Sequence, residues 1–210
     1  MKINKWMVLL VILSLIGTGI LYPYLPEQVP GHWNVKGQID RYQNKTWVFF
    51  TAMLPLLLYL FMTVLPKIDP KKKAYLKHTK AYDVTRIMIV LFLVIIHWVT
   101  ITVALGYDIN VGFVMRILTG ILFILLGNYM SQIRPNYFFG IKTPWTLANE
   151  QVWKKTHRVG GYSFIIMGII SIVTAFLEGQ MGWMVMMVGI VAAVLYPFVY
   201  SYLLFNKIEK

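Results

Sequence analysis

Six long apolar stretches restrict the fold of this chain more than any other feature. A helix that crosses the hydrocarbon core of a bilayer needs about 20 mostly apolar residues. The stretches cover Trp6–Leu25, Trp47–Leu65, Val84–Leu105, Gly112–Ser131, Tyr162–Leu177 and Trp183–Phe205. Only helices and closed barrels cross lipid, because lipid offers the backbone no hydrogen-bond partners. The stretches are continuous rather than alternating, which favours helices. We therefore expect an all-α, polytopic membrane bundle of about six transmembrane helices.

The composition excludes an ordinary soluble domain. Apolar residues make up 58% of the chain and charged residues only 13%, whereas a typical globular domain has about 25% charged residues. A net charge of +12 would suggest nucleic-acid binding in a soluble protein. Here the charges cluster between the apolar stretches, so we attribute them to the lipid bilayer and to topology, and expect no direct nucleic-acid binding. The absence of cysteine excludes disulfides and thiolate chemistry.

The basic residues alternate between the two sides of the predicted membrane. Cytoplasmic loops collect Lys and Arg. Fifteen of the 20 basic residues fall on one side, namely Lys2, Lys5, Lys67, Lys71, Lys72, Lys73, Lys77, Lys80, Arg134, Lys142, Lys154, Lys155, Arg158, Lys207 and Lys210. Three fall on the other, namely Lys36, Arg41 and Lys45. This asymmetry predicts cytoplasmic N- and C-termini. The short outer loops carry the acidic residues Asp108 and Glu178.

The first stretch has two interpretations. It follows Lys2 and Lys5, as a signal peptide would, but it is long and ends in Tyr22, Pro23 and Tyr24. No small-residue cleavage site is present there. We therefore expect an uncleaved first span.

Arg86, Arg116 and His97 lie within the predicted spans, where charge is costly. Arg116 and His97 are the two candidates for a functional role. Arg116 shares a helical face with Gly120, Phe123, Gly127 and Ser131, and glycines on one face allow another helix to approach closely. Arg116 either reaches the outer headgroups or lines an outward cavity that meets a ligand. His97 either hydrogen-bonds a neighbouring helix or relays protons. No Asp or Glu lies at its depth, which argues against a relay and against ion-coupled transport.

The search for enzyme motifs finds none. Paired catalytic carboxylates, H-E-x-x-H, G-x-S-x-G and P-loop patterns are all missing from the sequence. The four histidines, His32, His78, His97 and His157, lie on different segments, so they do not predict a metal site. We expect a protein that is not an enzyme and needs no cofactor.

The outer segment Leu25–Tyr42 is too specific for a simple connector. Pro26 and Pro30 stiffen its start, and Gly31 and Gly37 permit tight turns. Trp33 and Tyr42 carry rings suited to the membrane interface. The segment is either an ordered loop on the outer headgroups or a receptor for an external ligand.

The inner segment Gly127–Gly161 contains a predicted short helix. Asn149 is a suitable N-cap, Glu150 suits the first turn, and Gly160 is a natural stop, so we expect a helix over Asn149–Val159. Its apolar face consists of Val152, Trp153, Thr156 and Val159, and its basic residues are Lys154, Lys155 and Arg158. This amphipathic pattern predicts a helix lying in the interface, or one that docks a cytosolic partner, or both.

Both segments resemble one bacterial family. The outer segment, L-P-E-Q-V-P-G-H-W-N-V-K-G-Q-I-D-R-Y, resembles the DUF1648-type membrane segment at the N-terminus of SdpI-type proteins. The inner segment, G-N-Y-M-S-Q-I-R-P-N-Y-F-F-G-I-K-T-P-W-T-L-A-N-E-Q-V-W-K-K-T-H-R-V-G-G, is similar to the SdpI signature. The resemblance implies a DUF1648-like part over residues 1–83 and an SdpI-like part over residues 84–210. It also implies immunity to a secreted toxin peptide and recruitment of a cytosolic ArsR-type winged-helix repressor to the membrane.

The leading hypothesis is therefore a membrane receptor without catalysis. The residues expected to meet the external peptide are His32, Trp33, Asn34, Asp40, Arg41 and Arg116. Those expected in the inner motif are Asn128, Arg134, Asn136, Gly140, Lys142, Thr143, Pro144, Trp145, Trp153, His157 and Arg158. A ligand shifts such a protein only if it binds two of its states unequally.

Two other functions remain open at this point. A transporter of small amphiphiles would need a polar path, for which only Arg116, His97, Asn128 and scattered hydroxyls are available. A membrane enzyme acting on lipid or cell-wall precursors would use Asn136, His157 and Arg158 to hold a phosphate headgroup.

Overall fold

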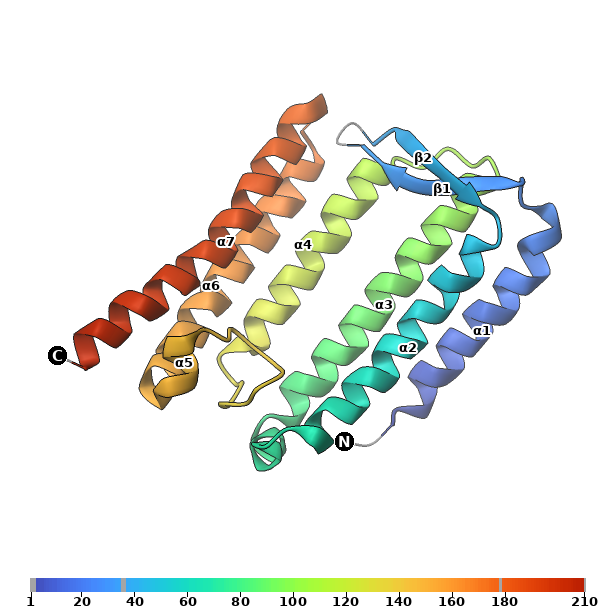
Figure 1. Cartoon of the computed structure of the whole chain (residues 1–210). Coiled ribbons are helices and arrows are strands. Elements are labelled where there is room, and N and C mark those ends of the chain that lie inside the picture. Colours follow the sequence, from blue (N-terminus) through green and yellow to red (C-terminus); the bar gives the residue numbers. More distant parts are fainter. Residues whose placement is uncertain (1–2, 35–36, 178, 210) are drawn as a thin grey trace. The chain divides into compact units, whose positions relative to one another are not determined.

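The computed structural model describes residues 3–34, 37–177 and 179–209, and six of its helices are long and apolar enough to cross a membrane (Figure 1). They are α1 (Lys5–Leu21), α2 (Trp47–Ile68), α3 (Thr79–Ala104), α4 (Val111–Met130), α6 (Glu150–Ala175) and α7 (Gly179–Ile208). The six-helix prediction is confirmed. The topology argument also used Lys2, Lys36, Glu178 and Lys210, which lie outside the described residues.

The helices expose apolar surfaces of the kind that contact lipid in a membrane protein. Large apolar side chains are exposed along whole helices, such as Trp6, Leu13 and Ile20 on α1 and Val188 and Leu203 on α7. In water such contiguous apolar surface would drive aggregation. The chain is thus a multi-pass membrane protein.

The described chain divides into two compact units. One contains Lys2–Thr63 with Arg86–Met115, and the other contains Val64–Thr85 with Arg116–Lys210. The division between residues 1–83 and 84–210 that the family resemblance suggested stays a prediction.

The unit of Lys2–Thr63 and Arg86–Met115 is held together by apolar and polar contacts. Val11, Tyr59, Val90 and Val94 form one buried cluster from α1, α2 and α3. The ring nitrogens of His97 lie 2.8 Å from Thr18 Oγ1 on α1 and 2.9 Å from Thr51 Oγ1 on α2. His97 is only 2% exposed, so it has the interhelical hydrogen-bonding role that was one of its two predicted interpretations.

This unit also contains a short antiparallel sheet that the all-helical expectation did not include. After a 3₁₀ turn, η1 (Tyr22–Tyr24), strand β1 (Gln28–Trp33) pairs with β2 (Ile39–Asn44). The pairing shifts between Pro30 and Trp33, where the strand is irregular. Gly37 has a φ of +76°, a left-handed conformation that glycine adopts without steric cost. The expectation of a turn at Gly37 is confirmed, whereas Gly31 lies inside β1.

In the other unit, α4 and α6 cross at glycines. A Cβ on Gly120 would lie 2.6 Å from the Gly168 carbonyl oxygen, and one on Gly127 would lie 2.6 Å from the Gly161 carbonyl oxygen. Small residues allow such close backbone approach in membranes. The predicted glycine face of α4 is confirmed as a helix-packing face.

The predicted helix Asn149–Val159 has the correct start and the wrong end. The Asn149 side chain accepts hydrogen bonds from the backbone N–H groups of Gln151 and Val152, as expected of an N-cap. The helix does not stop at Gly160 but continues as α6 to Ala175. Gly160 packs against Met130 and Ile141. Its lack of a side chain therefore allows these residues to lie close to α6 and does not end the helix. The separate interfacial helix is therefore the first part of a transmembrane helix.

Two further short helices lie between the spans. A 3₁₀ helix, η2 (Lys72–Lys77), precedes α3, and α5 (Pro144–Ala148) precedes α6. The α5 helix has a capping box, in which the side chains of Thr143 and Thr146 each accept the backbone N–H of the other residue. Sequence reasoning did not predict α5.

Candidate functional site

The five predicted outer residues of the hairpin gather on β1 and β2 and the turn between them. His32 pairs with Arg41 and Trp33 with Ile39 in the sheet. His32 Nδ1 lies 2.6 Å from Asp40 Oδ1, and the two side chains are 60% and 41% exposed. Arg41 is exposed, and Trp33 and Asn34 are partly exposed. The hairpin therefore exposes charged groups and, in part, an aromatic ring and a side-chain amide.

The hairpin is anchored to the helices of its own unit. Val29 on β1 is completely buried and forms a cluster with Leu25, Val48 and Ile101. Burying such side chains contributes roughly 1.5–3 kcal/mol each. At the base of the hairpin, Lys45 Nζ donates to Glu27 Oε1 at 2.8 Å, and this hydrogen bond raises the pKa of Lys45. The exposed side chains are thus presented from a fixed support.

Arg116 does not lie on an open surface. Its guanidinium donates to the backbone carbonyls of Thr174 and Leu177, at the C-terminal end of α6, and lies over the Trp183 ring. The residue is 6% exposed. A cation near a helix C-terminus is stabilised by the helix dipole. Arg116 therefore secures the end of α6, and its predicted contact with an external ligand stays a prediction without support from its surroundings.

In the inner segment, Asn136 shapes the backbone of residues 134–139. Its side-chain amide donates to the carbonyls of Arg134 and Phe139 at 2.8 Å each, and its Oδ1 accepts the N–H groups of Phe138 and Phe139 at 3.0 and 2.7 Å. The residue is completely buried. All its hydrogen-bonding capacity is used inside the protein, so Asn136 is not free to hold a lipid headgroup.

A buried polar network that sequence reasoning missed joins η2 to this turn. Asp69 is 2% exposed. Its carboxylate accepts the Tyr75 hydroxyl at 3.0 Å and the backbone N–H groups of Lys71 and Tyr137 at 2.7 and 2.9 Å. The Tyr75 hydroxyl also lies 3.1 Å from Asn136 Oδ1. Burial and the neighbouring Asp69 carboxylate raise the pKa of Tyr75, so this hydroxyl keeps its proton.

His78 belongs to the same network. Its Nδ1 accepts the backbone N–H of Arg134 at 3.2 Å, which places the ring proton on Nε2. Within the described residues Nε2 has no hydrogen-bond partner. Burial lowers the pKa of His78 to about 4; the charge of Arg134 adds to this effect and Asp69 opposes it. His78 is therefore neutral at physiological pH.

His157 and Gly140 form a second fixed point. His157 Nε2 accepts the N–H of Ile141 at 3.0 Å, and its Nδ1–H donates to the Trp153 carbonyl at 2.9 Å. A neutral imidazole satisfies both bonds. Gly140 has a φ of +111° and faces His157 so closely that a Cβ there would collide with Nε2. Trp153 stacks on His157 and donates through Nε1 to the Ile133 carbonyl at 2.8 Å.

The remaining inner residues divide into buried and exposed groups. Thr143 is 2% exposed, with its hydroxyl 3.0 Å from Ser201 Oγ on α7, and Trp145 packs against Phe198 and Tyr202 of the same helix. Exposed or partly exposed residues of the segment include Asn128, Lys142, Pro144 and Arg158. Asn128 and Arg158 line a 300 Å³ pocket with Gly127, Ser131, Gly161, Tyr162 and Ile165. The predicted motif is mainly a folding unit with a few accessible side chains.

Two comparisons with known sequences bear on this arrangement. The model of the SdpI/YfhL protein family matches residues 132–201, and the model of a domain of unknown function, DUF1648, matches residues 9–58. Over its whole length the chain is 30% identical to the immunity protein SdpI of Bacillus subtilis (strain 168), of which it covers 99%. The chain belongs to the SdpI/YfhL family. No solved structure matches it.

The family assignment confirms the resemblance on which the sequence-based hypothesis depended. In this SdpI/YfhL protein the DUF1648 match contains the outer hairpin, and the SdpI match contains Asn136, Gly140 and His157. Within the described residues, no group of three His, Cys, Asp or Glu side chains is arranged to hold a metal ion.

Proposed function

We propose that this protein protects its cell against a secreted antimicrobial peptide that it meets at the outer hairpin. The observation that supports this most strongly is the full-length similarity to an immunity protein. The hairpin adds a surface suited to a peptide, because it combines the exposed His32–Asp40 pair with Arg41 and Trp33. Aromatic residues and Arg are enriched where proteins bind protein partners.

Survival of a peptide-sensitive bacterium tests this proposal. Cells that express the full chain should survive a dose of the secreted peptide that kills cells with an empty vector. D40N should lose most of this protection, because it removes the charge that His32 faces at 2.6 Å. D108N is the matched control, since Asp108 is an exposed acid in another predicted outer loop.

Two results would contradict the proposal. The first is killing of cells whose membranes contain the wild-type chain at verified levels. The second is an equal loss of protection in D40N and D108N, which would separate immunity from the hairpin.

A second function, docking of an ArsR-type winged-helix repressor, is favoured by one feature of the inner segment. Tyr137 and Phe138 are 45% and 38% exposed, although the turn that carries them is fixed by Asn136 and Asp69. We propose that this exposed pair is the repressor contact. A fluorescent repressor of this class should concentrate at membranes that contain the wild-type chain and stay in the cytosol with Y137A/F138A. Unchanged recruitment by this double variant would rule the contact out.

A further inference from the structure

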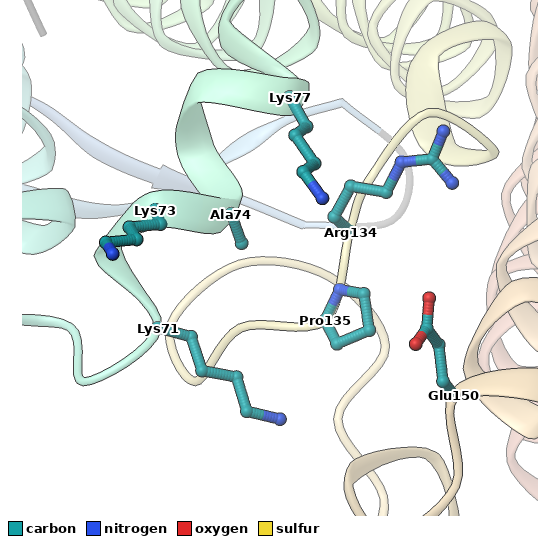
Figure 2. Close-up of a pocket in the computed structure, with 7 residues that line it drawn as sticks. All are labelled: Lys71, Lys73, Ala74, Lys77, Arg134, Pro135 and Glu150. Atoms are coloured by element: carbon teal, nitrogen blue, oxygen red, sulfur yellow. The ribbon is translucent and has the colours of Figure 1, made fainter.

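We propose that a basic pocket between η2 and the start of α6 binds a phosphate group, carried by an anionic phospholipid or free in solution. The pocket has a volume of 380 Å³ and is lined by Lys71, Lys73, Ala74, Lys77, Arg134, Pro135 and Glu150. Figure 2 shows Lys71 and Lys77 reaching from one side toward Pro135, with Glu150 on the other. Lys73 lies at the rim with its ammonium turned away.

The pocket carries a marked excess of positive charge. Four of its seven lining residues are cations and one is an acid. The acid, Glu150, already makes an ion pair with Lys154 at 3.0 Å. Asp69 lies beside Lys71 in the chain, but it is buried and its carboxylate is occupied by Tyr75 and two backbone N–H groups. The nearby acids therefore leave much of the positive charge in the pocket unbalanced.

The cations are attached to a backbone that is fixed before any ligand arrives. The Asp69 carboxylate accepts a hydrogen bond from the backbone N–H of Lys71 at 2.7 Å. His78 Nδ1 accepts one from the backbone N–H of Arg134 at 3.2 Å, and Asn136 Nδ2 donates one to the Arg134 carbonyl at 2.8 Å. A mobile lysine loop would lose conformational entropy when it closed around an anion. This arrangement removes the backbone part of that cost.

The position of the pocket favours a phosphate on a lipid. It lies where α2 ends and α6 begins, both of which are cytoplasmic ends in the predicted topology. Basic pockets between transmembrane helices on this side commonly bind phospholipid headgroups. Next to Lys77, Leu76 is 81% exposed, and an exposed Leu among lysines suits contact with a membrane surface.

Binding of defined lipids to the full chain in nanodiscs tests the inference. Phosphatidylglycerol in a phosphatidylcholine background should bind the wild-type chain, as measured by native mass spectrometry. K71Q/K77Q should weaken this binding about tenfold or more. K72Q/K80Q is the matched control, because it removes the same charge from exposed lysines of the same segment that do not line the pocket. It should change binding by less than about twofold.

A variant with the opposite expected effect strengthens the test. E150Q removes the one carboxylate that lines the pocket and should tighten binding. Thermal stability of each variant without anionic lipid shows that it is folded. A separate arm replaces the lipid with inorganic phosphate in phosphatidylcholine nanodiscs. Stabilisation that depends on Lys71 and Lys77 in this arm alone would support the phosphate site and identify free phosphate as the source.

Three outcomes overturn the inference. The first is an equal loss of binding in K71Q/K77Q and K72Q/K80Q, and the second is weaker binding by E150Q. The third is that the wild-type chain shows no preference for phosphatidylglycerol over phosphatidylcholine and also no effect of inorganic phosphate. None of these results depends on whether the protein confers immunity, so this inference and the proposed function fail independently.

Discussion

At the scale of single residues, Asn136 has the clearest structural role in the inner segment. Replacing it with Ala removes four hydrogen bonds to the backbone, together with the contact to the Tyr75 hydroxyl, and leaves partly buried backbone groups of Arg134, Phe138 and Phe139 without that partner. Leaving such groups unsatisfied should lower the free energy of unfolding by about 2–4 kcal/mol.

Thermal unfolding in detergent measures this effect. The exposed residue Asn128 provides the control, because it is the same residue type, and N128A should shift the melting temperature little. An N136A melting temperature equal to that of the wild type would show that the turn does not depend on this side chain.

His78 should make stability depend on pH. Its pKa is about 4 in the folded protein, against about 6.5 in an unfolded chain. Between these values the unfolded state binds more protons, so stability falls as pH decreases from 6.5 to 4 and is unaffected by this group above 6.5. H78Q removes the titrating group while retaining an acceptor for the Arg134 N–H.

The comparison of interest is therefore the slope of melting temperature against pH. H78Q should have a shallower slope than the wild type between pH 4 and 6.5, and the other histidines contribute equally to both proteins. Parallel slopes would show that His78 titrates normally.

At the scale of elements, His97 should behave as a link between three helices. It joins α3 to Thr18 of α1 and Thr51 of α2. Interhelical hydrogen bonds in membranes contribute about 0.5–2 kcal/mol, so H97F should lower the melting temperature measurably. H32A, which changes an exposed histidine, should not. Equal melting temperatures for H97F and the wild type would argue against the link.

The number of spans could be predicted from the sequence, whereas one helix end could not. The six spans were predictable because the length of an apolar stretch is set by the thickness of the bilayer. The end of the predicted helix at Gly160 was wrong because glycine has two uses. In water a glycine after a helical pattern is a natural stop, but here Gly160 and Gly161 bring α6 close to its neighbours.

The hairpin and the buried network were beyond sequence reasoning for different reasons. Strand β1 contains Pro30 and Gly31 and shows no regular alternation, so its sequence reads as a loop. Asp69, Tyr75 and His78 look like ordinary polar residues of a basic connection. Their burial depends on contacts with residues 134–139, which lie more than 50 positions away in the chain.

At the scale of the whole molecule, every functional proposal depends on the direction in which the chain crosses the membrane. The hairpin must face outward to meet a secreted peptide. The exposed Tyr137 and Phe138 must face the cytoplasm to meet a repressor, and η2 must face it to meet the inner leaflet. The distribution of Lys and Arg predicts this orientation.

Labelling of single cysteines in intact cells measures the orientation directly. The chain has no cysteine of its own, so each introduced thiol is the only target on the protein. Tyr42 on β2 is 53% exposed and Leu76 on η2 is 81% exposed. With a membrane-impermeant maleimide, Y42C should be labelled in intact cells and L76C only after the cells are permeabilised. Labelling of L76C but not Y42C in intact cells would contradict the account.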